Sequence, residues 1–527
     1  MLPWLRDAIF YEIYPQSFYD SNDDGIGDIN GITEKLGYIR DLGCNALWIN
    51  PCFDSPFKDA GYDVRDYAQV ASRYGSNADL ERLFRQAHTM GMHVLLDLVP
   101  GHTSEEHAWF VQSKRAEPNE LSDRYIWTNS TFANADGMPF IGGESPRDGT
   151  YILNFFKSQP ALNYGFGTRN QVWQQSPDSS AANATKHAMI DIMRFWLSRG
   201  CDGFRVDMAD SLVKKDDEEK TETIRVWQQM LRPIRAEFPE AAFVSEWGRP
   251  WQAFKAGFDM DFYLDWRWDG KPNGYSLLAR NTDHPETRSG DMSYFASDSP
   301  TTIDAFLADY LPQYYRVDGH GAFCFITGNH DSPRLAPRLS ISEIAVAYAM
   351  FLTMPGIPFI YYGDEIGMRY QSLPSVEGGY RRTGSRTPMQ WNNGRNCGFS
   401  DADPDRLYLP VDHSSGAPTV EQQQGDSQSL LNSVKELTTL RRRSVALRPD
   451  APFAVIAAPL GSKTFVYRRG EGEHSLIIAL NAGNTLQRLS HDALGLLTSP
   501  TCVVSRNARL TDSSLELGPS SYAIMAR

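Results

Sequence analysis

The sequence predicts an α/β protein: a (β/α)8 TIM barrel with an inserted subdomain after strand 3 and a C-terminal antiparallel β-sandwich domain. Three features predict it: short apolar runs, helical patterns between them, and ionisable residues at the ends of several runs. Strands that alternate with helices form a parallel sheet, and eight such units close into a barrel. Ionisable groups at the carboxyl ends of the strands then meet at one mouth of the barrel.

The strand predictions rest on runs that are apolar on both faces, as in Ala242-Phe243-Val244, which suits strands buried between two layers. The eight predicted strands are Ile9–Tyr14, Asn45–Ile49, Val94–Val99, Gly203–Asp207, Phe243–Glu246, Phe262–Trp266, Phe323–Thr327 and Ile357–Tyr361. Before the fourth of these, apolar residues from Met189 to Trp196 recur at the spacing of one helical face. Leu80, Leu83 and Ala87 mark the helix before the third strand in the same way.

Two stretches interrupt the alternation of strands and helices. Residues 102–176 are polar and aromatic with scattered prolines, and they are too many for an ordinary loop. After Asp450 the helical pattern gives way to short β runs between Gly, Asn and Ser. The predicted domains are therefore a catalytic barrel in two parts (1–101 and 177–449), an inserted domain (102–176) and a C-terminal β domain (450–527).

Composition narrows the classes of partner. Lys and Arg number 51 and Asp and Glu 65, which gives a formal net charge of −14. We expect no nucleic acid partner, because such a surface repels phosphate polymers and no basic cluster offsets it. No apolar run reaches the length of a membrane span, and the first residues do not resemble a secretory signal, so we expect a cytoplasmic protein without a membrane partner. A monomer and a homo-oligomer both stay open.

Four segments with ionisable residues end predicted strands in a fixed order. They are HVLLDLVPGH (Asp97, His102), GFRVDMAD (Arg205, Asp207), AFVSEW (Glu246) and CFITGNHD (His330, Asp331). In this order they resemble the signature regions of the α-amylase superfamily, glycoside hydrolase family 13. Two further stretches, Met354 to Met368 and the RTPMQW segment from Arg386 to Trp391, are similar to the branch that contains oligo-1,6-glucosidase, α-glucosidase and trehalose synthase.

Cleavage of a glycosidic bond needs one ionised and one protonated carboxyl group. Arg205 shares a strand face with Asp207 and should lower the pKa of that aspartate, which makes Asp207 the expected nucleophile. Glu246 has an aromatic neighbour and no adjacent cation, which favours a raised pKa and the role of general acid. The resemblance implies the same two roles and makes Asp331 the third catalytic carboxylate, which stabilises the transition state.

The candidate substrate-binding residues are Asp59, Tyr62, His102, Arg205, His330 and Arg386. Tyr62 offers a flat apolar face on which a pyranose ring can stack. We expect Asp97 to hydrogen-bond Arg205 and orient it. The resemblance implies that His102 and His330 hydrogen-bond the sugar in the cleavage subsite. It also implies that Asp59 and Arg386 grip the terminal sugar, and an ion pair between them would close the far wall and make the enzyme exo-acting.

The loop after the first strand carries oxygen donors at alternate positions with glycines between them, a spacing typical of a calcium loop. Relatives bind a structural Ca²⁺ here, and no catalytic cofactor is expected. The alternative is an Asx-rich turn without a metal. The predicted ligands are Asp20, Asn22, Asp24, Ile26 and Asp28.

Three residues depart from the pattern of the family. Gly101 stands where Asn usually precedes the histidine, so a calcium site at that place is not supported. Ala161 replaces the acid of the branch's QPDLN stretch, and Met208 is neither the Val typical of 1,6-cleaving relatives nor the Thr of 1,4-cleaving ones. Linkage preference therefore stays open.

The sequence thus predicts a retaining, exo-acting α-glucosidase that acts on small oligosaccharides or disaccharides through a covalent glucosyl-Asp207 intermediate. The alternative is a glucosyl-transferring or isomerising enzyme on the same scaffold, of the trehalose synthase or sucrose-acting type. A third possibility is a non-catalytic barrel like the heavy chain of amino-acid transporters. The full carboxylate set argues against it, as does the absence of an anchor-like run.

Overall fold

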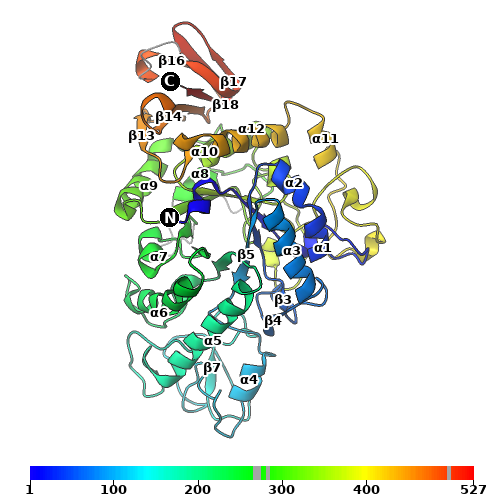
Figure 1. The fold of residues 1–527 in the computed structure, drawn as a ribbon, viewed down its shortest axis with the longest axis vertical. Coiled ribbons are helices and arrows are strands. Elements are labelled where there is room, and N and C mark those ends of the chain that lie inside the picture. Colours follow the sequence, from blue (N-terminus) through cyan, green and yellow to red (C-terminus); the bar gives the residue numbers. More distant parts are fainter. Residues whose placement is uncertain (265–273, 280–284, 495–499, 527) are drawn as a thin grey trace.

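Eight parallel strands form a closed barrel at the centre of the protein (Figure 1). The computed structural model describes residues 1–264, 274–279, 285–494 and 500–526. The barrel order is β1-β12-β11-β10-β9-β8-β5-β2, which confirms the predicted barrel. Its strands are β1 (Phe10–Ile13), β2 (Ala46–Ile49), β5 (His93–Leu98), β8 (Gly203–Val206), β9 (Ala242–Ser245), β10 (Met260–Phe262), β11 (Ala322–Ile326) and β12 (Ile357–Tyr361).

Helices surround the barrel and cover the outer faces of its strands (Figure 1). Two of them begin with a reciprocal capping box, in which Ser76 pairs with Asp79 and Ser340 with Glu343. The described helices of the barrel are α1 (Ile29–Glu34), α2 (Leu36–Asp41), α3 (Asn77–Thr89), α5 (Ser180–Leu197), α6 (Thr221–Glu237), α7 (Pro250–Ala256), α8 (Gly274–Ala279), α9 (Ile303–Val317), α10 (Ile341–Thr353), α11 (Val420–Gln424) and α12 (Leu430–Arg443). The two helices predicted from apolar spacing are α3 and α5.

The sixth strand begins and ends earlier than the sequence predicts. The prediction was Phe262–Trp266, but β10 spans Met260–Phe262, and Trp266 lies outside the described residues. The cause is Asp261, a carboxylate inside a buried strand. It interrupts the apolar pattern, so the sequence resembles a loop at this point. Its side chain accepts hydrogen bonds from Ser245 and from the backbone of Trp247, so the burial is compensated.

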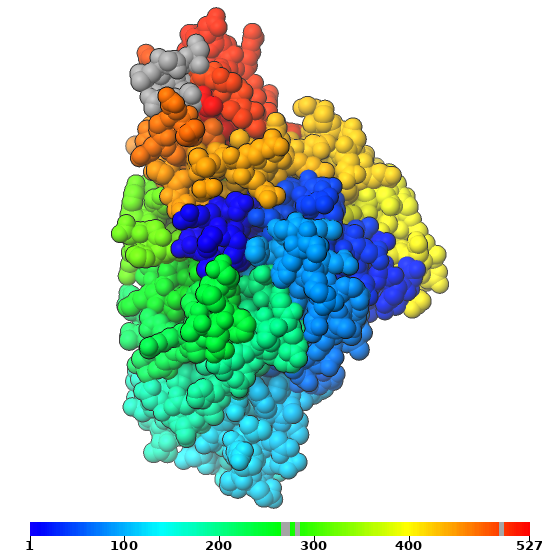
Figure 2. Space-filling view, in the orientation of Figure 1, coloured from blue at the N-terminus to red at the C-terminus, as the bar shows by residue number. Residues whose placement is uncertain are grey.

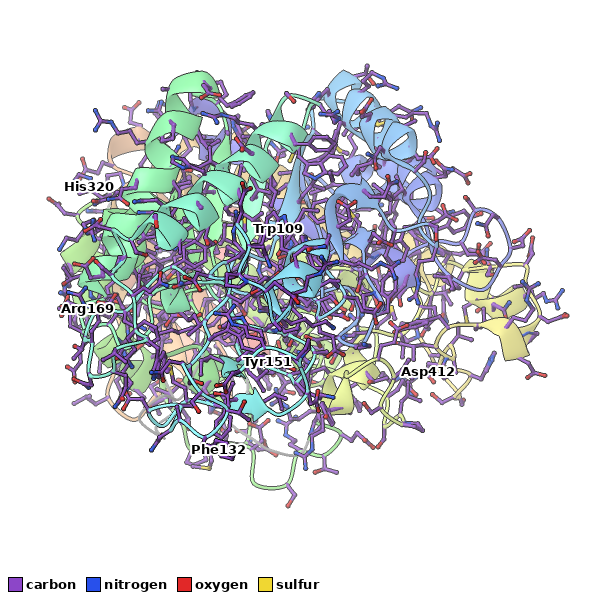
Figure 3. The ribbon with its side chains drawn as sticks, turned by 90° about the horizontal axis from the view of Figure 1, so that it is seen from below. Trp109, Phe132, Tyr151, Arg169, His320 and Asp412 are labelled. Carbon is purple, nitrogen blue, oxygen red and sulfur yellow. The ribbon has the colours of Figure 1, made fainter. Side chains whose placement is uncertain are left out.

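The segment predicted as an inserted domain contains α4 (Ala108–Ser113) and an antiparallel pair, β6 (Phe140–Gly142) with β7 (Thr150–Ile152). A second pair, β3 (Phe53–Asp54) with β4 (Asp66–Val70), precedes it in the chain. The inserted segment projects from one end of the barrel, and Figure 3 looks at that end: Trp109 and Tyr151 lie near its centre and Phe132 at its edge. Its small core gathers apolar residues such as Ile126, Ile152 and Phe166. The boundaries of the domain stay a prediction.

The C-terminal domain is an antiparallel β domain, as predicted, and its described residues contain six strands. They are β13 (Phe453–Ala457), β14 (Thr464–Arg469), β15 (Leu476–Asn481), β16 (Gln487–Ser490), β17 (Thr501–Leu510) and β18 (Ser514–Ala526). They make one sheet in the order β13-β14-β15-β18-β16, with β17 also paired to β18. The domain packs on the end of the molecule opposite the inserted segment (Figure 2). Buried Arg469 anchors it by donating a hydrogen bond to the carbonyl of Thr353 at the end of α10. Among the described helices, none is long and apolar enough to cross a bilayer.

Candidate active site

The side chains that follow the barrel strands converge on one cavity of about 380 Å³. Asp207 directly follows β8, and Glu246 directly follows β9. His102 and Asp331 come from the segments after β5 and β11. The cavity is lined by Asp59, Tyr62, His102, Phe155, Phe156, Asp207, Met208, Glu246, Asp331, Tyr380 and Arg382. The three predicted catalytic carboxylates and three of the six predicted substrate-binding residues therefore share one space.

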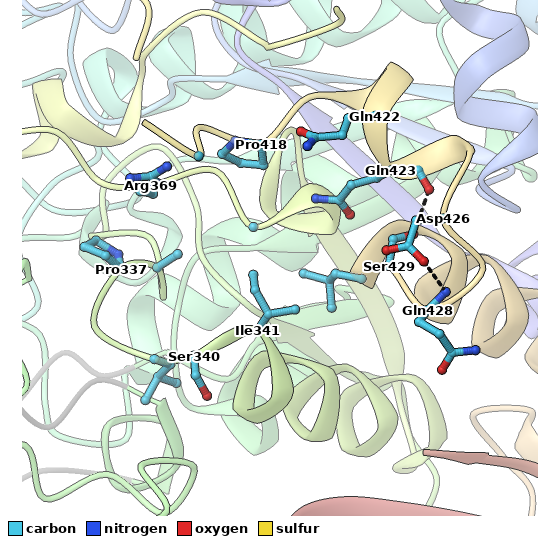
Figure 4. A pocket seen from close by; sticks show the side chains of 15 residues that line it. Pro337, Ser340, Ile341, Arg369, Pro418, Gln422, Gln423, Asp426, Gln428 and Ser429 are labelled. Atoms are coloured by element: carbon cyan, nitrogen blue, oxygen red, sulfur yellow. Dashed lines mark hydrogen bonds between the residues drawn. The ribbon is translucent and has the colours of Figure 1, made fainter. Parts of the chain in front are cut away.

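A larger cavity, of about 620 Å³, lies outside the barrel mouth, between the start of α10 and the α11–α12 region (Figure 4). Its lining includes Ile341, Pro418 and Gln423, and Asp426 is the one carboxylate among the described residues that line it. Hydrolysis of a glycosidic bond needs two carboxyl groups facing one another. The smaller cavity is therefore the candidate active site.

Arg205 is buried, and its guanidinium group contacts three carboxylates. Its Nη1 lies 2.8 Å from Asp97 Oδ1 and 3.0 Å from Asp207 Oδ1, and its Nη2 lies 2.7 Å from Glu246 Oε2. Asp97 thus orients the guanidinium, as the sequence predicts. The contact with Glu246 was not predicted, because the sequence shows no cation beside that residue.

The pKa of Asp207 is raised and not lowered, which corrects the sequence-based expectation. Burial raises the pKa of Asp207 to about 7, and the attraction of Arg205 only partly opposes it. Burial raises the pKa of Glu246 to about 8; Arg205 opposes the rise, and the negative charge of Asp207 adds to it. Both carboxyl groups of this pair therefore hold a proton more readily than ordinary acids, as the role expected of Glu246 requires.

Asp331 lies at the opposite side of the cavity, where two arginines hold it. Its Oδ1 lies 2.9 Å from Arg382 Nη1 and 3.0 Å from Arg386 Nη2. Desolvation opposes ionisation, but His330 and the two guanidinium groups outweigh it and hold the pKa of Asp331 well below its usual range. Asp331 therefore keeps its negative charge at pH values where an ordinary aspartate would be partly protonated.

The predicted ion pair between Asp59 and Arg386 is wrong in its arginine. Arg382 Nη2 lies 3.2 Å from Asp59 Oδ1, whereas Arg386 Nε donates to the carbonyl of His330 and its Nη2 reaches Asp331. Arg382 lies four residues before Arg386 on a turn of 3₁₀ helix, and that turn carries it into the cavity. A single guanidinium therefore bridges Asp59 and Asp331.

His330 and Tyr62 form a stacked pair behind the cavity. Their rings are 5.3 Å apart at 11°, and the Tyr62 hydroxyl lies 2.6 Å from His330 Nε2. Buried Glu12 contacts His330 Nδ1 at 2.8 Å and fixes the ring from the other side. These contacts fix the position of the Tyr62 ring, and the stacking of a sugar on it stays a prediction.

Five lining residues were not among the predicted site residues: Phe155, Phe156, Met208, Tyr380 and Arg382. The Phe155 and Phe156 rings pack edge to face at 4.5 Å, and Tyr380 lies 5.9 Å from Phe156. The aromatic residues come from the inserted segment and from the irregular stretch after β12, where no periodicity marks a site. The one available signal was the adjacency of Phe155-Phe156 to the QPALN stretch.

The predicted calcium loop is closed by its own hydrogen bonds. Asp20 accepts from the backbone of Asn22, Asp23 and Gly25, and Asp28 accepts from Ser21 and caps α1. Among the described residues there is no group of three His, Cys, Asp or Glu side chains placed to hold a metal ion. This pattern is that of an Asx-rich turn, so calcium in the loop stays a prediction.

Chelation tests that prediction. If the loop holds Ca²⁺, removal of divalent ions should lower the Tm but leave kcat unchanged wherever the protein stays folded, because the loop is separate from the reacting carboxylates. Asp24 accepts one hydrogen bond, from the backbone of Ile26, so Asp24→Ala should remove most of the sensitivity to chelator while costing little else. A melting curve that chelator leaves unchanged would favour the metal-free turn.

Comparison with known proteins gives the family. Residues 12–450 match the family described as alpha amylase, catalytic domain. The chain is a member of the α-amylase family. Trehalose synthase/amylase TreS of Mycolicibacterium smegmatis is 32% identical to this α-amylase family member over 84% of this chain and 76% of its own. Maltase 1 of Drosophila virilis is 30% identical over 98% of this chain and 85% of its own.

Solved structures agree with the fold of this α-amylase family member. Trehalulose synthase MutB from Pseudomonas mesoacidophila MX-45 superposes with a TM-score of 0.81 at 23% identity and covers 100% of both chains. An isomaltulose synthase mutant from Erwinia rhapontici NX5, solved with its natural substrate sucrose, gives a TM-score of 0.80 at 24% identity over 99% of this chain and 98% of its own. At these identities the likeness establishes the architecture alone.

Proposed function

We propose that this α-amylase family member is a retaining, exo-acting α-glucosidase that releases glucose from small oligosaccharides or disaccharides. Asp207 attacks the anomeric carbon, and Glu246 protonates the leaving oxygen and then activates water. Asp331 binds sugar hydroxyls and stabilises the positively charged transition state. The two-step reaction passes through a glucosyl ester of Asp207.

The spacing of the carboxyl pair carries the proposal of retention. Asp207 and Glu246 are close enough to share a hydrogen bond, and both contact Arg205. Inverting enzymes separate their carboxyl groups by about 6.5–9.5 Å to admit a water, whereas retaining enzymes keep them about 5–5.5 Å apart. A pair within hydrogen-bond reach leaves no room for that water, which supports direct attack by Asp207.

The side of the cavity formed by Asp59, Arg382 and Asp331, here called the far wall, supports the exo-acting mode. Arg382 bridges Asp59 and Asp331, and Gln159 donates a 2.8 Å hydrogen bond to the second oxygen of Asp59. We propose that this chain of contacts blocks a sugar chain that extends beyond the terminal glucose. A terminal glucose fits such a blind pocket, and its hydroxyl groups match the charged groups of the wall.

Product analysis on maltose, isomaltose, sucrose and trehalose tests the proposal. We expect free α-glucose at early times from at least one of these sugars, with retained configuration by NMR. Release of β-glucose from sucrose or trehalose, whose leaving groups contain no β-glucose, would contradict retention. Maltotriose and longer products from soluble starch at early times would contradict the exo mode while leaving a retaining glycosidase in place.

Isomerisation is the second candidate, and the lining of the cavity is what favours it. Phe155, Phe156 and Met208 present apolar surface beside the carboxylates. A leaving sugar that stays bound against this surface would shield the covalent intermediate from water and could re-attack it. One relative is named a trehalose synthase/amylase and one similar structure a trehalulose synthase. A disaccharide isomer that accumulates faster than glucose would select this reading.

The pH dependence of kcat/KM should be a bell with its maximum between about 7 and 8. Asp207 must be ionised, so activity falls as the pH drops below the pKa of about 7. Glu246 must be protonated, so activity also falls as the pH rises above the pKa of about 8. Glu246→Gln should abolish the alkaline limb, because its amide does not titrate. A wild-type maximum near pH 4–5, about the range of ordinary carboxyl groups, would contradict these assignments.

A further inference from the structure

The absence of a side chain at Gly101 has a local cause. The backbone of Gly101 is not in the left-handed region, so other residues could adopt its conformation. A Cβ at this position would lie 2.8 Å from Nδ2 of Asn154, closer than real Cβ contacts. Asn154 belongs to the inserted segment, just after β7, and it occupies the space that a side chain at residue 101 would need.

Asn154 stands in a chain of hydrogen bonds whose direction is fixed at both ends. Lys214 Nζ lies 2.8 Å from Asn154 Oδ1 and also donates to the carbonyl of Ser211 at 3.0 Å. An ammonium group only donates, so the amide must turn its Nδ2 toward His102 Nδ1, 3.0 Å away. Nδ1 of His102 then has to accept.

The hydrogen bond on the other side of the His102 ring requires the same tautomer. Its Nε2 lies 3.1 Å from the carbonyl oxygen of Tyr62, which only accepts. The ring therefore carries its proton on Nε2 and is neutral. Burial lowers the pKa of His102 to about 4, in agreement with this hydrogen-bond pattern. Asn154 Nδ2 also lies 3.8 Å from the sulfur of Met208, the residue after Asp207.

We propose that Asn154 is a positioning residue that holds His102 as its neutral Nε2–H tautomer beside the candidate nucleophile, and that Gly101 lacks a side chain to make room for it. The inserted segment thereby sets the state of a residue that borders the cavity. Its effect on turnover rests on the proposed function, but its effect on the imidazole does not.

Asn154→Asp separates this role from simple space filling. The aspartate keeps the volume of Asn154 and gains an ion pair with Lys214, so a merely structural role predicts an unchanged or raised Tm and unchanged activity. A positioning role predicts that the carboxylate demands a proton on Nδ1. NMR of protein with ¹⁵N-labelled histidine reads this directly, and His102→Gln assigns the signal among the 11 histidines.

In the wild type we expect a neutral Nε2–H imidazole for His102 across the neutral range. In Asn154→Asp we expect Nδ1 to carry a proton, together with a fall in kcat/KM of about tenfold, the size of one hydrogen bond. The same tautomer in both proteins would overturn the proposal. The NMR result needs no substrate, so failure to hydrolyse glucosides would count against the proposed function alone.

A double-mutant cycle tests the second part of the proposal, that Gly101 lacks a side chain to make room for Asn154. Gly101→Ala should lower kcat/KM by about tenfold in the wild type, because its Cβ displaces Asn154 and removes the hydrogen bond to His102. In an Asn154→Ala background the space is vacant, and the same substitution should change kcat/KM less than about twofold. Equal effects in the two backgrounds would show that Gly101 and Asn154 are independent, and the proposal would fail.

Discussion

Asp207→Ala should lower kcat on every accepted α-glucoside by at least about 10⁴-fold while leaving the fold intact. The alanine removes the oxygen that forms the glucosyl ester, so the covalent intermediate cannot form. Arg205 keeps two of its three acidic partners, Asp97 and Glu246, so the buried guanidinium stays paired. Steady-state kinetics and a melting curve on the same preparation measure both effects.

Glu246→Gln provides the contrast, because it removes the acid and leaves the nucleophile. Activity on natural sugars should fall by about 10²–10⁴-fold, and aryl glucosides with good leaving groups should be spared more. In Asp207→Ala, by contrast, a good leaving group should bring no rescue, whereas added azide should restore turnover and give a glucosyl azide of inverted configuration. If the two variants respond alike to leaving group and azide, the two roles are assigned incorrectly.

The barrel is predictable from sequence because its strands are buried on both faces and read as short apolar runs. Seven of the eight predicted runs lie within about a residue or two of observed strands, an error ordinary for element ends. The exception is β10, where Asp261 interrupts the apolar pattern. Its neighbour Asp259 likewise accepts from Phe243 and Arg235. Tertiary hydrogen bonds made both carboxylates compatible with burial, and they are invisible in a linear pattern.

The candidate site is predictable from sequence only where the separation of two residues along the chain indicates that they are close in the fold. Arg205 stands two residues from Asp207, and that spacing correctly places them together. The same spacing does not show how deeply Asp207 is buried, and burial decides the direction in which its pKa shifts. Nor does it show that Glu246 contacts Arg205, because Glu246 follows a different strand. The choice between Arg382 and Arg386 depends on an irregular turn, for which sequence offers no periodic signal.

The bridge made by Arg382 joins two carboxylates with different charge behaviour. Asp331 is fully ionised, whereas burial raises the pKa of Asp59 to about 6 even though Arg382 attracts its charge. Without Arg382, Asp59 would lose its ion pair and its pKa would rise further, so the far wall would lose both a cation and part of an anion near pH 7. The wall therefore depends more on Arg382 than on either acid alone.

Arg382→Ala should consequently lower kcat/KM on maltose by about 10²-fold, the combined size of two charge-assisted hydrogen bonds. The shorter side chain also opens the far wall, so the ratio of starch to maltose activity should rise, and short oligosaccharides should appear among the early products. Arg381→Ala is the matched control: it removes an exposed arginine that does not line the cavity and should change both activities less than about twofold.

Asp59→Asn should couple to Arg382→Ala in a double-mutant cycle, because each substitution breaks the same ion pair. Additive effects, with starch still a poor substrate, would show that the Asp59–Arg382 pair does not close the pocket, and the exo-acting mode would then need another wall.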